Sequence, residues 1–205
     1  MAREIDARGM LCPKPVILTK KELDDMKEDE RLLTIVDNEA ARINMSKLYS
    51  NLGYEFEVEE KDGYFYIEGI KGKTLEGKNE KESGEISNRL SQIGDNTVIL
   101  FDKDKLGHGN DELGGVLIKG FLYTLTEFKN KPKTLIFLNG GVKLTTEGSD
   151  VVLDIEKLEK EGVEIYSCGT CLDYYNLADK LKVGEVTNMY TIAEKLLNAS
   201  NTIKL

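Results

Sequence analysis

Three cysteines are the residues of this chain best suited to covalent chemistry, and the first of them has an unusual setting. Cys12 stands directly before Pro13-Lys14-Pro15, so two prolines fit the first turn of one helix, where proline loses no hydrogen bond. The helix begins at Pro13, or else at Pro15 with Lys14 as its cap, because a residue before proline disfavours the helical conformation. In both cases we predict that the free amides and the dipole of a helix start favour the thiolate of Cys12, the nucleophilic form.

The accessibility of Cys12 follows from its neighbours. A lone cysteine is more often a small buried side chain than a reactive group. Here Arg8 and Gly9 indicate a polar turn that leaves a strand, and the spacing of an amphipathic helix begins only after the cysteine, at Val16. We therefore expect an exposed thiol at Cys12, with Lys14 as a nearby cation.

A second sulfur site lies in the run Cys168-Gly169-Thr170-Cys171, between a predicted strand and a predicted helix. Thr170 and Asp173 have the spacing of a capping box, which predicts Thr170 as the cap and Cys171 as the first helical residue. Both sulfurs would then lie near a helix start. A thioredoxin-like redox pair has the same spacing, and burial as inert core side chains is the remaining alternative. Tetrahedral zinc needs four ligands, and His108 is the chain's single histidine.

Other residues near the predicted strand ends are weaker candidates. His108 lies between two glycines and is able to act as an acid or base, although a solvated loop histidine is the simpler interpretation. Asn139-Gly140-Gly141 either presents amides to an anion or forms only a tight turn. Tyr174 and Tyr175 are expected to pack against the sheet.

Composition limits the classes of function. A net charge of −9 argues against a nucleic-acid groove, which needs clustered lysine and arginine. Three cysteines do not make a disulfide framework for 205 residues and indicate a reducing compartment. The N-terminus has no apolar signal segment, and no apolar stretch approaches the ~20 residues that cross a bilayer. We expect a cytoplasmic protein with no direct contact to nucleic acid or membrane.

The first 70 residues predict a two-layer α/β sandwich in which two helices cover one face of a four-stranded sheet. Asp37 or Asn38 would cap the second helix and Gly53 would end it, while Lys61-Asp62-Gly63 indicates a hairpin. The expected strands are 4–7, 31–36, 54–59 and 64–70, and the expected helices run from Cys12 to about Lys27 and over 39–52.

A change of composition divides the chain. Residues 71–94 are poor in apolar side chains and rich in Gly, Ser, Lys and Glu, which predicts a flexible linker. Residues 95–205 alternate apolar strands with longer helices, which predicts a mostly parallel α/β sheet with helices on both faces. The expected strands are 97–101, 134–138, 163–166 and 202–204, and the expected helices are 112–128, 150–161, 172–181 and 192–198.

Both predicted domains resemble families of sulfur-handling proteins. Residues 1–70, with Cys12-Pro13-Lys14-Pro15 and the closing hairpin, resemble the TusA (SirA-like) family, in which the cysteine of a C-P-x-P motif carries a persulfide. Residues from about 95 to 205 resemble the DsrE/DsrF-like sulfur-relay family, through Asn139-Gly140-Gly141-Val142-Lys143 and Cys168-Gly169-Thr170-Cys171-Leu172-Asp173. The combination is similar to the YedF family of sulfurtransferase-like proteins, which is associated with selenium metabolism.

The resemblance implies a role for each cysteine. Cys12 would be the carrier, Cys168 lies closest to the acceptor position of DsrE-like proteins, and Cys171 would be a resolving or assisting thiol. A thiolate holds sulfane sulfur and reduced selenium under nearly the same physical conditions, so the element carried stays open. The expected partners are a sulfur or selenium donor of the cysteine desulfurase kind and an acceptor protein, with no cofactor and no metal.

Two other classes of function stay open. A dithiol oxidoreductase would use only Cys168 and Cys171 and would form a reversible disulfide. A non-catalytic regulatory or binding module would use the thiol positions for contacts alone. The segment from Leu113 to Leu125 is apolar around much of its circumference, which predicts burial either in the core or at an interface between copies of the chain in a homo-oligomer.

Overall fold

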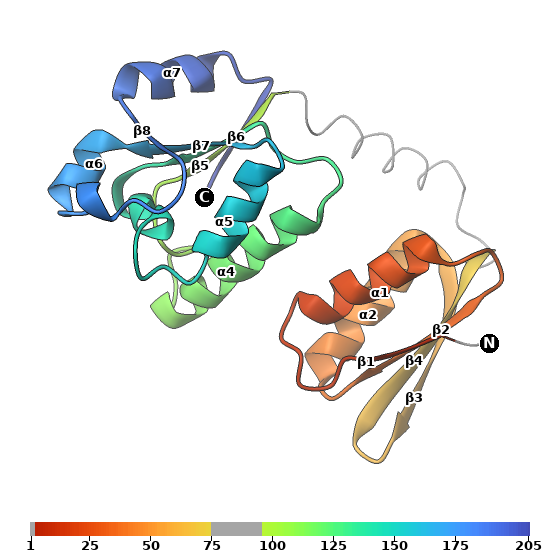
Figure 1. Cartoon of the computed structure of the whole chain (residues 1–205). Coiled ribbons are helices and arrows are strands. Elements are labelled where there is room, and N and C mark those ends of the chain that lie inside the picture. The colour runs from red at the N-terminus through yellow and green to blue at the C-terminus, as the bar shows by residue number, and fades with distance from the viewer. Residues whose placement is uncertain (1–2, 75–95) are drawn as a thin grey trace. The chain divides into compact units, whose positions relative to one another are not determined.

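A computed structural model describes residues 3–74 and 96–205 of the chain (Figure 1). The chain divides into two compact units, residues 1–88 and 89–205. Residues 71–74, expected in the linker, instead continue the last strand of the first unit, and residues 75–94 of the expected linker lie outside the described residues. In the part of the chain that the structure describes, no helix is long and apolar enough to cross a membrane.

The first unit is a four-stranded sheet with two helices on one face, which confirms the predicted two-layer arrangement (Figure 1). The strand order is β1-β2-β4-β3, with β1 parallel to β2 and the other pairs antiparallel. The elements are β1 (Arg3–Asp6), α1 (Lys14–Asp25), β2 (Arg31–Val36), α2 (Glu39–Leu52), β3 (Tyr54–Lys61) and β4 (Tyr64–Thr74).

The expected signals set the ends of these elements. Asn38 caps α2 by accepting a hydrogen bond from the amide of Ala41 at 2.9 Å, and Gly53 ends the helix in the left-handed conformation at φ 74°. Asp62 and Gly63 both have positive φ, as a tight turn between β3 and β4 requires.

Tyr49 of α2 determines how closely helix and sheet approach in the first unit. Its ring is fully buried and packs among Leu32, Met45 and Ile67. A Cβ atom built on Gly69 of β4 would lie 2.1 Å from that ring. Glycine at this position therefore lets the tyrosine lie flat on the sheet.

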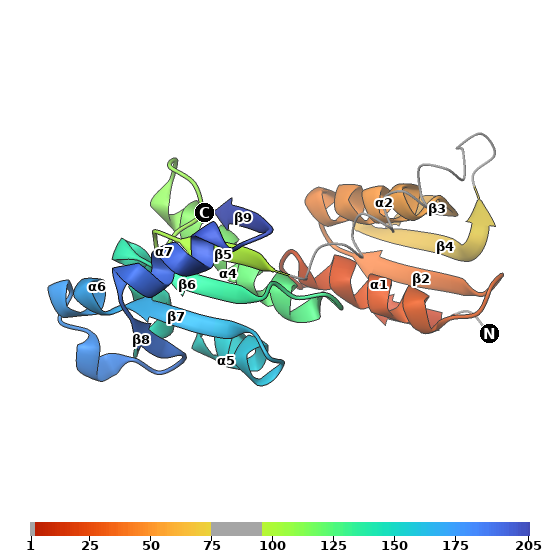
Figure 2. The same cartoon turned by 90° about the horizontal axis from the view of Figure 1, so that it is seen from above.

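The second unit contains a five-stranded sheet in which every neighbouring pair is parallel, in the order β8-β7-β6-β5-β9. Figures 1 and 2 show α4 and α5 on one face and α7 on the other, which confirms the predicted architecture. The elements are β5 (Thr97–Phe101), α4 (Asp111–Glu127), β6 (Thr134–Phe137), η1 (Asn139–Thr145), α5 (Val152–Lys160), β7 (Glu164–Cys168), α6 (Gly169–Tyr174), η2 (Ala178–Lys180), β8 (Glu185–Thr187), α7 (Met189–Leu197) and β9 (Asn201–Lys204).

Alternate residues of the central strands build two separate cores. Phe101 and Phe137 stack at 4.8 Å between ring centres, in the core that contains residues of α4 and α5. Val98 and Ile136 face the other way, toward Ile192 of α7. Both faces of the sheet are therefore buried, as parallel sheets require.

The second unit differs from the sequence prediction in its local detail. The helix expected over 172–181 is split into α6 and η2, because Asn176 adopts a left-handed φ of 55° and ends α6. The tight turn at residues 139–141, one of the two readings left open, is present and forms the first turn of a 3₁₀ helix, η1. Strand β8 was not expected, since its three residues pair with β7 but carry no clear alternation.

The apolar segment Leu113–Leu125 lies within α4 and has two different faces. Ile118, Leu122 and Leu125 are buried in the core of the unit. Leu113, Val116 and Leu117 are exposed, each with 44–55% of its surface accessible. The core therefore accounts for one face of this helix and leaves the other apolar face uncovered within the described residues.

Candidate functional site

Cys12 is exposed and lies just before a helix, and both predictions are confirmed. Helix α1 begins at Lys14 with Pro13 in the cap position, between the two expected starts. The carbonyl of Pro13 already accepts the first helical hydrogen bond, from the amide of Ile17 at 3.1 Å. The peptide bond from Cys12 to Pro13 is cis. The Lys14 amide donates to the carbonyl of Leu11 at 3.0 Å, and Cys12 is the residue directly before the cap of α1.

The loop that carries Cys12 is fastened to the start of α2. The carboxylate of Asp37 accepts a hydrogen bond from the amide of Gly9 at 2.6 Å and another from the side chain of Asn38 at 2.9 Å. The Gly9 amide, and then Asn38, hold the pKa of Asp37 below its usual value. Gly9 itself has a φ of 72°, which suits glycine. The loop before α1 is thereby linked to the start of α2.

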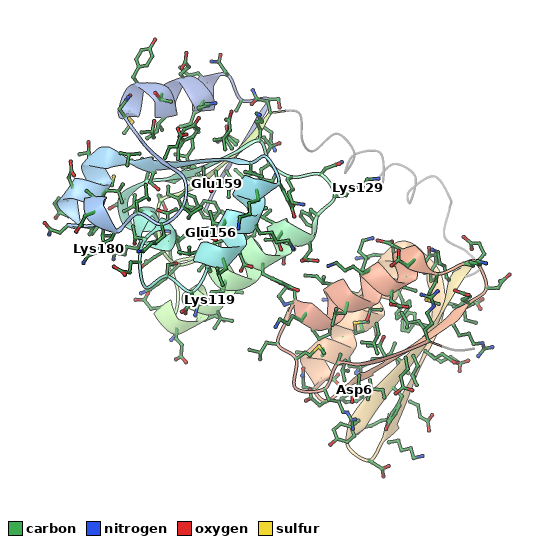
Figure 3. The ribbon with its side chains drawn as sticks, in the orientation of Figure 1. Asp6, Lys119, Lys129, Glu156, Glu159 and Lys180 are labelled. Carbon is green, nitrogen blue, oxygen red and sulfur yellow. The ribbon has the colours of Figure 1, made fainter. Side chains whose placement is uncertain are left out.

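Arg8 forms an ion pair with Asp6 and also lies over an aromatic ring. Its Nη2 lies 2.6 Å from a carboxylate oxygen of Asp6, which is labelled in Figure 3, and its charged end lies 5.0 Å from the ring centre of Tyr64. The hydrogen bond from Arg8 lowers the pKa of Asp6 to about 2. The polar turn expected here is thus an ion pair at the end of β1.

A pocket of about 320 Å³ opens beside Cys12. Its walls come from the loop, the first turn of α1 and the first turns of α2, and they are largely apolar. The side-chain amide of Asn44 points at the sulfur, with 3.9 Å between Nδ2 and Sγ. The lining residues are Met10, Leu11, Cys12, Pro15, Val16, Asn38, Ala40, Ala41 and Asn44. The thiol therefore faces a small cavity whose polar groups are amides rather than charges.

Both sulfurs of the pair lie at the start of α6, as expected, but Cys168 is buried, which was the less favoured alternative. It is the last residue of β7, only 2% exposed, and it packs in the core cluster of Val98, Ile136 and Ile192. Helix α6 begins at Gly169, so the expected cap at Thr170 was also wrong. The reason is that β7 runs two residues further than expected and carries Cys168 into the sheet.

Cys171 is half-buried and lies at the ends of two neighbouring strands. Its Sγ accepts a hydrogen bond from the backbone amide of Asn139 at 3.1 Å. Burial is the main cause that raises the pKa of this thiol, contact with Cys168 raises it further, and the Asn139 amide acts in the opposite direction. The structure therefore brings together the Asn139 loop and the cysteine pair.

Tyr175 is the residue that sequence reasoning missed at this site. It was expected only to pack, but its hydroxyl donates a hydrogen bond to the side-chain oxygen of Asn139 at 2.8 Å. The signal available in the sequence was its position four residues after Cys171, where helical side chains lie on one face.

The other residues proposed from sequence lie apart from the thiols or have structural roles. His108 is exposed in the loop before α4. The amide of Gly141 donates to the carbonyl of Leu138 at 2.8 Å, and a Cβ atom there would lie 2.2 Å from the carbonyl oxygen of Phe101. Gly141 is therefore required by close packing. Among residues 3–74 and 96–205, no three His, Cys, Asp or Glu side chains are grouped to hold a metal.

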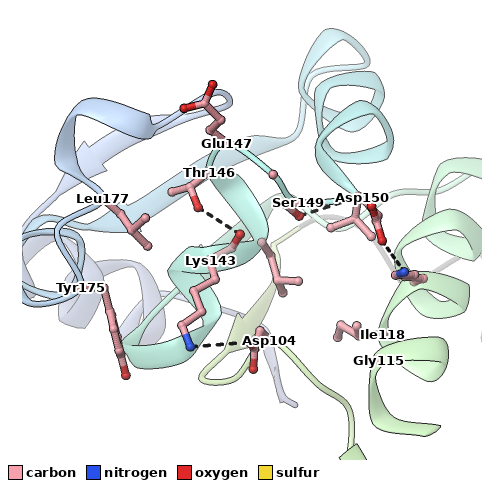
Figure 4. A pocket seen from close by; sticks show the side chains of 14 residues that line it. Asp104, Gly115, Ile118, Lys143, Thr146, Glu147, Ser149, Asp150, Tyr175 and Leu177 are labelled. Atoms are coloured by element: carbon pink, nitrogen blue, oxygen red, sulfur yellow. Dashed lines mark hydrogen bonds and ion pairs between the residues drawn. The ribbon is translucent and has the colours of Figure 1, made fainter. Parts of the chain in front are cut away.

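A second pocket, of about 470 Å³, borders the same part of the second unit (Figure 4). Tyr175 forms one wall, with the ammonium of Lys143 at 5.0 Å from its ring centre and 3.7 Å from Asp104. Lys119 and Asp150 form an ion pair on another side. Neither Cys168 nor Cys171 lines this pocket.

The first unit is a small α/β sandwich that presents one exposed thiol at a helix start, and comparison with known proteins assigns its family. The family described as sulfurtransferase TusA matches residues 3–71. A candidate sulfur carrier protein of Methanocaldococcus jannaschii is 36% identical over 52 residues, which are 25% of this chain and 69% of that protein. The chain belongs to the TusA family through this part, and the membership supports a sulfur-carrier role.

Two solved structures are also similar to parts of the chain. The SirA-like protein of Desulfitobacterium hafniense is 38% identical, with 34% of this chain and 97% of that chain covered and a TM-score of 0.33. A protein of unknown function from Methanobacterium thermoautotrophicum is 18% identical, with 53% of this chain and 97% of that chain covered and a TM-score of 0.41.

Proposed function

We propose that the protein is a relay for sulfane sulfur or reduced selenium, with Cys12 as the carrier and the pair Cys168 and Cys171 as the acceptor within the same chain. The observation that carries the proposal is the exposed thiol of Cys12 at a helix start, beside an apolar pocket, in a member of the TusA family. The donor is a protein of the cysteine desulfurase kind, and a further protein accepts the cargo.

Loading of Cys12 is an exchange between sulfur atoms. The Cys12 thiolate attacks the outer sulfur of a persulfide on the donor, the bond between that sulfur and the donor cysteine breaks, and the donor leaves as a thiolate. No net oxidation occurs, so neither cofactor nor metal is needed. The apolar walls of the pocket lie beside the sulfur, and the amide of Asn44 is placed to donate to it.

The proposal for the second unit rests on its likeness to the DsrE-like family and on the contact between its two thiols. Cys171 packs against the core cluster that contains Cys168, and all three cysteines are free. A sulfur received by one thiol can leave as hydrosulfide when the other thiol attacks and closes a disulfide. The fusion of a carrier with such a pair is the arrangement of the YedF family, which supports selenium as an alternative cargo.

The neighbouring thiols also support a second candidate, a dithiol oxidoreductase. In that case the chemistry lies only in Cys168 and Cys171, and Cys12→Ala leaves the redox activity unchanged. A non-catalytic module is the third class, and replacement of all three cysteines by serine would then preserve function in cells. The free thiols of the described residues suit a cytoplasmic, reducing compartment.

Loading with a cysteine desulfurase tests the proposal. The full chain is incubated with the desulfurase and cysteine, and its intact mass is measured before and after a reductant. We expect an adduct of about 32 Da, one sulfur, that reduction removes and that peptide mapping places on Cys12. Cys12→Ser is the matched variant, and selenide with a selenocysteine lyase forms the parallel arm. A free Cys12 that gains no mass in either arm contradicts the proposal.

A further inference from the structure

We infer that Cys171, rather than Cys168, is the thiol of the second unit that takes up the cargo, and that Tyr175 is a positioning residue that holds the Asn139 amide against it. The inference rests on the proposed function and names the acceptor within it. Likeness to the DsrE-like family alone favoured Cys168. The geometry of β7, η1 and α6 favours Cys171.

Cys168 and Cys171 differ in how accessible they are to a reacting partner. An incoming thiolate must approach a persulfide along its S–S bond, so the accepting sulfur has to be reachable by a second protein surface. Cys168 is 2% exposed and lies beneath α7, against Ile192. Cys171 is partly exposed on α6. A persulfide from outside the second unit can therefore meet Cys171 first.

The two thiols also differ in their hydrogen bonds. The Asn139 amide lies 3.1 Å from Cys171 Sγ and donates to it, so negative charge that develops on this sulfur is stabilised. The amide acts against the burial that raises the pKa of Cys171. A thiolate of raised pKa is scarcer at neutral pH but intrinsically more nucleophilic, and the amide increases its population.

Tyr175 fixes the position of that amide. Asn139 follows β6 with a left-handed φ of 45°, and its side chain accepts the hydrogen bond of the Tyr175 hydroxyl at 2.8 Å. The backbone amide of Tyr175 in turn bonds the carbonyl of Cys171 at 3.1 Å. The ammonium of Lys143 lies over the ring of Tyr175, 5.0 Å from its centre (Figure 4). Tyr175 thus links the loop that carries the donor to the helix that carries the acceptor.

The transfer is balanced without an outside oxidant. The Cys171 thiolate attacks the outer sulfur of the Cys12 persulfide, the bond from that sulfur to Cys12 breaks, and Cys12 leaves as a thiolate. Cys168, already beside Cys171, then attacks the inner sulfur, a disulfide between the two cysteines forms, and the outer sulfur leaves as hydrosulfide. The two cysteines lose two electrons and the sulfane sulfur gains them. Burial of Cys168 is no obstacle, because this second step takes place within the pair.

Alkylation of the full chain tests the order of reactivity without any sulfur donor. Iodoacetamide is applied over a range of pH, and peptide mapping gives the rate at each cysteine. We expect Cys171 to react faster than Cys168. Tyr175→Phe slows Cys171 about threefold to tenfold at neutral pH and moves its pH profile upward, as loss of one hydrogen bond implies. Cys12 in the same sample is the internal standard.

Tyr174→Phe is the matched control, since it removes a hydroxyl from the adjacent residue, which is 79% exposed. We expect this variant to alkylate like the unchanged protein. A faster reaction at Cys168, or equal rates at Cys171 in the two tyrosine variants, overturns the inference. The unchanged protein alone decides the first point, so the result does not depend on the folding of a variant.

Transfer experiments separate this inference from the proposed function. After desulfurase treatment, Cys168→Ala is expected to hold sulfur on both Cys12 and Cys171, and Cys171→Ser on Cys12 alone. Sulfur on Cys168 in Cys171→Ser overturns the inference while the relay stands. Absence of sulfur from Cys12 in every variant contradicts the proposed function, whereas the alkylation order is measured independently of it.

Discussion

The amide of Gly9 donates a hydrogen bond of 2.6 Å to the carboxylate of Asp37, and through this bond the loop before Cys12 is held against the start of α2. These residues are 28 positions apart in sequence. The bond fixes the position of a thiol that is itself exposed, so the geometry of the carrier site depends on a residue outside the motif.

Loss of this hydrogen bond should slow the loading of Cys12 strongly and lower the stability of the fold only slightly. Asp37→Ala leaves the Gly9 amide without its acceptor, while Asp37→Asn retains one oxygen at the same place. We expect desulfurase loading to fall severalfold in Asp37→Ala and less in Asp37→Asn, with thermal unfolding only slightly changed. Equal loading by all three proteins would show that the loop keeps its position without the bond.

Because Asp6 and Arg8 form an ion pair, we predict that the free energy of unfolding depends on pH in the acidic range. The Arg8 hydrogen bond lowers the pKa of Asp6 from 3.8 to about 2, so its contribution is fully present above 3.8 and is lost as the pH falls toward 2. Asp6→Asn should therefore flatten the fall of stability in this window. Urea unfolding of both proteins at several acidic pH values measures the difference, and parallel curves argue against the pair.

Gly141 is expected to tolerate no side chain. A Cβ atom would lie 2.2 Å from the carbonyl oxygen of Phe101, so Gly141→Ala forces the backbone at the end of β5 to move, at a cost of roughly 1–3 kcal/mol. Gly140→Ala is the control, because its Cβ would lie 3.7 Å from the nearest atom. Denaturant unfolding of the two variants tests the difference, and equal stability is the contrary outcome.

Because Cys12 lies beside a pocket, we predict that filling the pocket affects reaction with a small reagent less than reaction with a donor protein. Ala41 lies in its wall, and Ala41→Phe fills much of a cavity of about 320 Å³. We expect iodoacetamide to alkylate Cys12 at nearly the same rate, and loading by the desulfurase to fall severalfold, because the donor must place its persulfide there. Ala41→Ser, which adds only one hydroxyl group, is the control, and a matching fall in both rates would indicate a damaged loop instead.

Much of the fold could be predicted because its signals are local. Asn38 and Gly53 mark the ends of α2, and the apolar runs 31–36 and 97–101 coincide with β2 and β5. The exposure of Cys12 was also predictable, since the apolar spacing of α1 begins only after it.

The errors arose where contacts between residues distant in sequence determine burial and strand formation. Cys168 is surrounded in sequence by small and polar residues, but it pairs with Thr187 of β8 in the sheet, and its side chain packs with Ile192 of α7. The hydrogen bond from Asn139 to Cys171 joins the ends of two strands, and only the order of the sheet brings those ends together. Strand β8 forms because β7 offers it an edge, not because its three residues carry a pattern.

The most direct test of the relay follows the cargo in time. The full chain is mixed with a desulfurase and isotopically labelled cysteine, the reaction is stopped at intervals by alkylation, and labelled sulfur is assigned to each cysteine by peptide mass. The account predicts label first on Cys12, then on Cys171, and no label on Cys171 in the Cys12→Ser variant. Label that reaches Cys171 without passing through Cys12, or that never appears on Cys12, would contradict it.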